Sequence, residues 1–200
     1  MRAGTRIGVA TVLVTMVAAG CTSQDPGTAG PTSSGGSATT PSVSIPPRPK
    51  SLNATNVDPC TLVTDSQIAQ LNAQAGTPGP GEPASGTTSS CTYQVSQPVR
   101  YTINVRIEPK RGIDYWLTYT GTWQDRQTTV SSYPAVQIIS KGEDWNGADG
   151  TLCRTLVSIA DGQELSAGTL PSSRDLSMTQ LCDVSKQAAT LALATLQAKN

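Results

Sequence analysis

Cysteine placement constrains this chain more than any other feature of its sequence. Five cysteines are present, and four of them lie beyond residue 55: Cys60, Cys91, Cys153 and Cys182. No two of these are two residues apart, and the chain has no histidine, so zinc sites and thioredoxin-like redox pairs lack their ligands and spacing. We therefore expect two structural disulfides, which small exported domains use to supplement a limited core.

Four cysteines allow three pairings. We favour Cys60 with Cys91 and Cys153 with Cys182, because each pair then joins a residue near the start of a predicted helix to a predicted strand. Each bridge would close a loop of about 30 residues, which corresponds to roughly 3–4 kcal/mol in the loop-entropy model.

The amino-terminal segment has the pattern of an export signal. Arg2 and Arg6 precede an apolar stretch over residues 7–19, which is too short to span a ~30 Å hydrocarbon core. Small residues at 18–20 lead directly to Cys21, an arrangement that resembles the lipobox of bacterial lipoproteins. We therefore expect a signal peptide over 1–20 and diacylglycerol on the sulfur of Cys21. The alternative is ordinary cleavage after Ala19 or Gly20, which would leave Cys21 as a spare thiol.

Residues 21–55 are rich in Ser, Thr, Gly and Pro and have almost no apolar side chains. Such a segment cannot bury enough surface to offset its ordering entropy, so we expect a disordered tether. The expected location is the extracytoplasmic face of a cell membrane, with residues 56–200 as a single ectodomain.

The ectodomain pattern predicts an α+β fold in which an antiparallel sheet carries packed helices at both ends of the chain. The clearest strand is 101–108, where apolar and polar residues alternate, and Asp161-Gly162 is a strong hairpin signal. Thr64 and Gln67 form a predicted capping box. The expected helices are 64–75, 113–119 and 176–197; the expected strands are 91–95, 101–108, 128–130, 135–140, 152–160 and 164–167; residues 76–90 and 141–150 are expected to be loops.

Composition excludes several functions. Without histidine, Ser-His-Asp and Cys-His catalytic arrangements are impossible, and no phosphate-binding glycine motif is present. The 14 basic and 14 acidic residues form no long run of either sign, so the basic face that a nucleic-acid-binding protein needs is missing. We expect no cofactor, no metal ion and no enzymatic activity.

Two groups of side chains are candidate sites. The aromatic residues Tyr115, Trp116, Tyr119 and Trp123 fall within nine residues and would line an apolar pocket or a partner surface, or else fill the core of a chain without phenylalanine. The loop 143–149 has Glu143, Asp144 and Asp149 beside Trp145, and it would contact a cation or a sugar, hydrolyse cell-wall glycan, or remain a solvated loop.

The arrangement as a whole resembles a known family. The lipobox-like Cys21, Asp58-Pro59-Cys60 before a helix, Tyr133-Pro134-Ala135-Val136 entering a strand and Cys182 at a terminal helix are similar to the actinobacterial lipoproteins of the LprB type, a domain-of-unknown-function family. The resemblance implies an exported envelope protein and supplies no catalytic residues. By analogy we expect a non-catalytic module that binds an envelope lipid or a protein partner; a structural wall-spacing protein is the other alternative.

Overall fold

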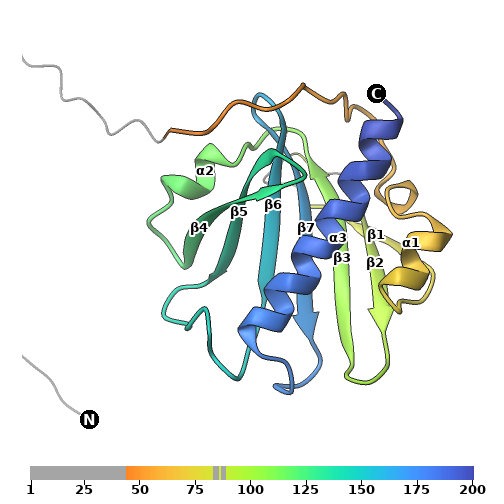
Figure 1. The fold of residues 1–200 in the computed structure, drawn as a ribbon, viewed down its shortest axis with the longest axis vertical. Coiled ribbons are helices and arrows are strands. Elements are labelled where there is room, and N and C mark those ends of the chain that lie inside the picture. Colours follow the sequence, from red (N-terminus) through yellow and green to blue (C-terminus); the bar gives the residue numbers. More distant parts are fainter. Residues whose placement is uncertain (1–43, 83–85, 87–88) are drawn as a thin grey trace, which may run out of the picture. The chain divides into compact units, whose positions relative to one another are not determined.

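The computed structural model describes residues 44–82, 86 and 89–200. The predicted signal peptide, Cys21 and the tether up to residue 43 lie outside these residues. Seven strands form one antiparallel sheet in the order β1-β2-β3-β7-β6-β5-β4, and helices pack on it, so the predicted α+β class is confirmed (Figure 1). Within the described ranges, no helix is both long and apolar enough to cross a membrane.

The strands are β1 (Thr77–Pro80), β2 (Ser89–Val95), β3 (Tyr101–Glu108), β4 (Trp123–Val130), β5 (Tyr133–Ser140), β6 (Cys153–Ala160) and β7 (Gln163–Pro171). The helices are η1 (Pro59–Thr61), α1 (Asp65–Gln70), α2 (Asp114–Leu117) and α3 (Met178–Ala198). Strand β3 has the predicted bounds, and β6 and β7 meet at the predicted Asp161-Gly162 hairpin.

Helix α3 lies across one face of the sheet and covers the main core (Figure 1). Ser177 caps its first turn, because its hydroxyl accepts from the Gln180 N–H while the Gln180 side chain accepts from the Ser177 N–H. The face it buries is centred on Leu181, Ser185 and Ala188. Val184 and Leu191 lie at the half-buried margin of this face.

Several elements differ from the predicted bounds; for example, β7 continues to Pro171, although its predicted end is residue 167. Helix α1 has the predicted capping box but ends at Gln70, because Asn72 has a left-handed φ of 51° and Ala73 then bridges Val95. The predicted loop 76–90 contains β1, which lies at the edge of the sheet. Proline has no N–H to donate, but at the outer edge of a sheet this costs no hydrogen bond, because no further strand of the described chain pairs there. Strand β4 begins at Trp123, five residues earlier than predicted, because its exposed polar residues conceal the pattern.

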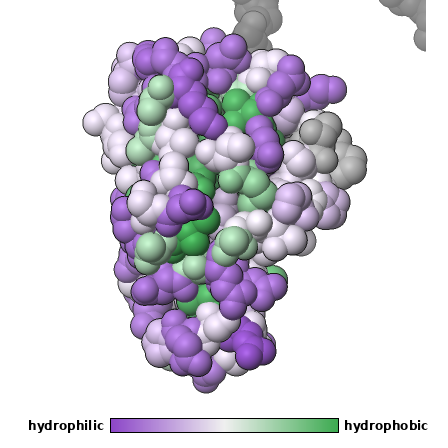
Figure 2. Space-filling model, turned by 90° about the vertical axis from the view of Figure 1, so that its right-hand side faces the viewer, coloured by the Kyte–Doolittle hydropathy of each residue, from purple (hydrophilic) through white to green (hydrophobic). Residues whose placement is uncertain are grey.

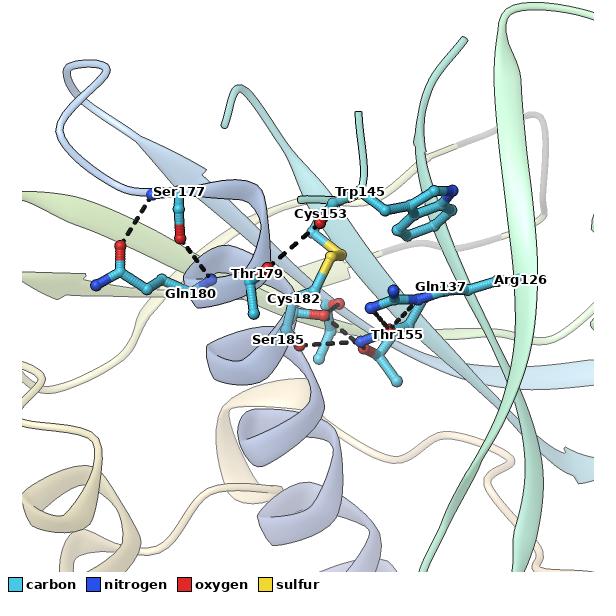
Figure 3. Close-up of a disulfide and its surroundings, with 11 residues drawn as sticks. Arg126, Gln137, Trp145, Cys153, Thr155, Ser177, Thr179, Gln180, Cys182 and Ser185 are labelled. Carbon is cyan, nitrogen blue, oxygen red and sulfur yellow. Dashed lines mark hydrogen bonds between the residues drawn. A yellow bond between two sulfur atoms is a disulfide. The ribbon is translucent and has the colours of Figure 1, made fainter. Parts of the chain in front are cut away.

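Both predicted disulfides are confirmed. Cys60–Cys91 joins η1 to β2, and Cys153–Cys182 joins β6 to the first turns of α3. Beside the second bridge, the Gln137 amide donates to the Cys182 carbonyl (3.0 Å) and the Thr155 hydroxyl (3.2 Å), while Ser185 bonds Thr155 (Figure 3). This buried network satisfies polar groups between the helix and the sheet.

The contacts of the folded domain begin before residue 56, where the sequence places its start. Leu52 is 1% exposed, and its N–H donates to the Ile159 carbonyl at 2.8 Å. Arg48 donates to the Ser158 hydroxyl at 2.8 Å and pairs with Asp161.

Seen from the side of β1 and α1, apolar residues reach the surface as a narrow band between hydrophilic ones (Figure 2).

Candidate functional site

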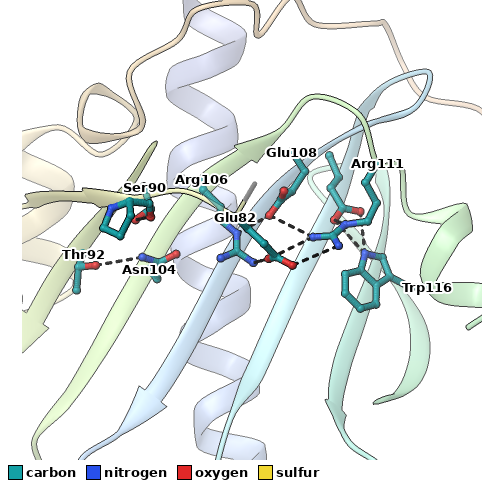
Figure 4. Close-up of polar contacts among 10 residues, drawn as sticks. Glu82, Ser90, Thr92, Asn104, Arg106, Glu108, Arg111 and Trp116 are labelled. Carbon is teal, nitrogen blue, oxygen red and sulfur yellow. Dashed lines mark hydrogen bonds and ion pairs between the residues drawn. The ribbon is translucent and has the colours of Figure 1, made fainter. Parts of the chain in front are cut away.

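The sheet face opposite α3 is only partly covered. Trp116 of α2 and Ile113, which directly precedes this helix, pack against Val136, Ile138 and Leu156 of β5 and β6. Over β2, β3 and β7 the described chain places no helix on this face (Figure 4). We call this uncovered part the open face.

A groove of about 290 Å³ lies in the open face. One row of directly opposed residues forms its floor: Thr92 of β2 faces Asn104 of β3, which faces Gly168 of β7, which faces Arg154 of β6. The lining is Pro80, Ser90, Thr92, Thr102, Asn104, Arg106, Leu152, Arg154, Ser166, Gly168 and Leu170. The groove therefore offers hydroxyls, an amide and two guanidinium groups, with leucines at its margin.

Glu108 of β3 and Glu164 of β7 lie directly opposite each other at one end of this face, and both are fully buried. Opposed carboxylates destabilise a sheet unless cations lie between them. Arg106 pairs with Glu108 and with Glu82 (2.7 Å), and Arg111 lies 3.4 Å from Glu82 and 3.5 Å from Glu108 (Figure 4). Two arginines thus hold the carboxylates together.

Glu164 has a different environment from the other two carboxylates. The Trp116 indole N–H donates to its two oxygens at 2.9 and 3.1 Å, and Arg111 lies 3.7 Å away. Burial raises the pKa of Glu164 to about 8, although the Trp116 bond and Arg111 oppose the rise. Glu164 is therefore largely protonated at neutral pH. The pKa of Glu82 moves in the opposite direction: partial burial raises it, but Arg106 and Arg111 together lower it by more, so the net shift is downward.

Of the two guanidinium groups that line the groove, that of Arg154 has no carboxylate partner in the described chain. Among the residues the structure describes, the Arg154 side chain forms no ion pair or hydrogen bond, and its guanidinium lies 5.5 Å from the ring centre of Trp123. Burial, and then the nearby charge of Arg106, lower the pKa of Arg154. A half-buried guanidinium without a partner is suited to bind an oxyanion.

A family model described as a protein of unknown function (DUF3558) matches residues 16–195. The chain belongs to this family. The match includes Cys21 and the four paired cysteines. No curated protein and no solved structure matches the chain.

The predicted aromatic site is only partly assembled in this DUF3558 domain. Tyr115, Trp116 and Tyr119 form a cluster with ring centres 5.0–6.1 Å apart. Trp116 is 4% exposed and packs in the core, whereas Tyr115 is 42% exposed. Trp123, on β4, forms no ring contact with these three among the described residues, but it packs against the hydrophobic cluster that contains Trp116 and lies next to Arg154. None of the four lines the groove, although Trp123 contacts one of its residues.

Two of the three carboxylates of loop 143–149 form hydrogen bonds to nearby residues in the sequence. Glu143 accepts from the Thr151 hydroxyl, and Asp144 accepts from the Asn146 N–H at 3.0 Å, while Asp149 is exposed. In the described ranges, no group of three Asp, Glu, Cys or His residues could hold a metal ion.

The groove residues were not singled out from the sequence. Alternation in 101–108 assigns Asn104, Arg106 and Glu108 to the polar side of one strand, and this signal was present. Arg154 gives only a weak signal, as the single charged residue of its strand. Strand β7 lies between β3 and β6, and this strand order brings Arg154 into one groove with the polar residues of β3.

Proposed function

We propose that this DUF3558 protein is an actinobacterial lipoprotein of the LprB type, anchored by lipid on Cys21 at the extracytoplasmic face of a membrane. We further propose that its domain is a non-catalytic binding module. The pattern around Cys21 and the two disulfides support an exported, anchored protein.

The groove on the open face is the observation that carries the binding proposal. It combines concave shape with a few convergent polar groups, which is typical of ligand sites. The residues in it favour binding over catalysis, because hydroxyls, an amide and guanidinium groups supply no general base near neutral pH. The nearby Glu82 and Glu108 are held by Arg106 and Arg111.

Replacing the anchor residue tests the location. In its native host, Cys21→Ser is expected to move nearly all of the protein from the membrane fraction to the medium or to leave it as the unprocessed precursor, because serine cannot form the thioether. Fractionation with mass analysis of the amino terminus measures this. An unacylated amino terminus in the wild type, or a variant that stays in the membrane fraction after its signal peptide has been removed, would contradict the anchor.

Blocking the groove tests the binding function. Asn104→Trp fills the floor, so a molecule that co-purifies with the full-length wild-type protein should be lost from it. Gln70→Trp, on exposed α1 away from the open face, is the matched control and should retain the molecule. Native mass spectrometry of protein extracted from host membranes provides the readout.

Two results of this experiment would count against the groove. If Asn104→Trp keeps the same bound mass as the control, the groove is not the site. If Tyr115→Ala or Trp123→Ala loses the mass while Asn104→Trp keeps it, the aromatic residues form the site instead.

A further inference from the structure

Arg154 is held in place by its neighbours on the sheet. It lies directly opposite Gly168, and a Cβ built at Gly168 would come within 3.2 Å of the Arg154 Cγ and 3.7 Å of its Nε. The missing side chain at Gly168 lets the arginine stem lie close to the floor, while Trp123 flanks its guanidinium. An arginine ordered in this way loses less conformational entropy when it binds an anion.

Charge balance indicates how much negative charge the groove favours. Arg106 and Arg111 pair with Glu82 and Glu108, and Glu164 is largely neutral at pH 7. Arg154 therefore contributes one positive charge that no carboxylate contact in the described chain offsets. A ligand with a single negative charge would offset it and leave no surplus.

Apart from Arg106, which pairs with Glu82 and Glu108, the other groups in the groove are neutral. The Asn104 amide donates to the Thr92 hydroxyl at 3.1 Å, and the Thr102 hydroxyl donates to the Leu170 carbonyl at 3.4 Å. Leu170 at the margin is 54% exposed, and Tyr115 is the other exposed large hydrophobic residue among those described. Leu152 also lines the groove. An apolar surface thus borders the position of the unpartnered cation.

We infer that the groove binds an organic monoanion, with its carboxylate or phosphodiester group on Arg154 and an adjoining apolar portion against Leu170. This inference rests on the proposed function, because it names the ligand class of the same groove. A planar guanidinium binds either oxyanion through two parallel hydrogen bonds. The volume of about 290 Å³ holds the anionic group and a few carbons, so a longer apolar chain would continue over Leu170.

Isothermal titration of the full-length protein tests this with defined probes. Octanoate and octyl methyl phosphate carry the two anionic groups, octyl glucoside carries the same tail without charge, and acetate and dimethyl phosphate carry the groups without the tail. We expect both tailed anions to bind more tightly than octyl glucoside and than the tailless anions. Their relative affinities identify which oxyanion the groove prefers.

Variants assign the binding to named side chains. Arg154→Gln is expected to weaken binding of the tailed anions at least tenfold. Arg126→Gln is the matched control, because Arg126 also stacks on a tryptophan (4.2 Å from the Trp145 ring centre) but lies outside the groove, so binding should be unchanged. Leu170→Asn should weaken octanoate binding and leave acetate binding unchanged.

Gly168→Ala keeps the charge of Arg154 but displaces its stem, so it should also weaken binding of the tailed anions. This variant provides the test if Arg154→Gln fails to fold. Octyl glucoside binding as tightly as octanoate, with no effect of Arg154→Gln or Gly168→Ala, would overturn the monoanion inference and leave the binding function standing. Absence of binding by every probe would also overturn it, while the co-purification result with Asn104→Trp would still decide the binding function separately.

Discussion

The Cys153→Ala/Cys182→Ala variant is expected to lose about 3–4 kcal/mol of unfolding free energy. These cysteines are separated by 29 residues, and the open chain regains the loop entropy that the bridge removes from the unfolded state. Both side chains are also fully buried, and alanine leaves space where the sulfur atoms packed. This loss is a large share of the 5–15 kcal/mol by which a typical domain is stable. Urea unfolding of the ectodomain at constant pH measures the loss.

The Cys60→Ala/Cys91→Ala variant provides the comparison for this experiment. Its loop spans 31 residues, so the entropic loss should be nearly the same. The first bridge holds η1 rather than α3, so the two variants separate the loop contribution from the helix packing. A loss below about 1 kcal/mol for Cys153→Ala/Cys182→Ala would show that α3 packs on the sheet without its covalent link.

The second large effect concerns Glu164 and pH. Its folded pKa of about 8 lies above the ordinary value of 4.5, so the folded state binds the proton more tightly than the unfolded state. The stabilisation is fully present below pH 4.5 and is lost as the pH rises toward 8. The unfolding free energy should therefore fall with rising pH, by up to about 1.4 kcal/mol per pH unit inside that window.

Glu164→Gln isolates this contribution, because the amide is neutral at every pH and its carbonyl still accepts from Trp116. The groups that face Glu164 are Glu108 on β3, Arg106, Arg111 and the Trp116 indole, and all of them remain in the variant. Urea unfolding at pH 5, 6, 7 and 8 should show the wild type weakening relative to Glu164→Gln. Parallel curves would mean that Glu164 is ionised in the folded protein throughout.

Glu82 responds in the opposite direction. Its lowered pKa stabilises the fold above pH 4.5, and this stabilisation is lost as the pH falls through its folded pKa. Because Glu82 is retained in both proteins, subtracting their curves leaves the Glu164 contribution. Glu82 and Glu164 therefore respond to pH in two separate windows.

Local patterns in the chain were enough to predict much of the fold. The alternation over 101–108, the Asp161-Gly162 turn and the Thr64–Gln67 capping box each involve neighbours a few residues apart, and the structure has all three. The cysteine pairing was also predictable, because each partner begins or borders a recognisable element. Short-range periodicity and turn chemistry carry this information directly.

The groove depended on the order of the strands. Asn104, Gly168 and Arg154 come from three strands, and only the placement of β7 between β3 and β6 brings them into one row. Glu108 shows the same limit: alternation places it on the polar side, yet it is fully buried because Glu164 and Arg111 lie against it. A period of two specifies which residues share a face, whereas the material above that face comes from distant parts of the chain.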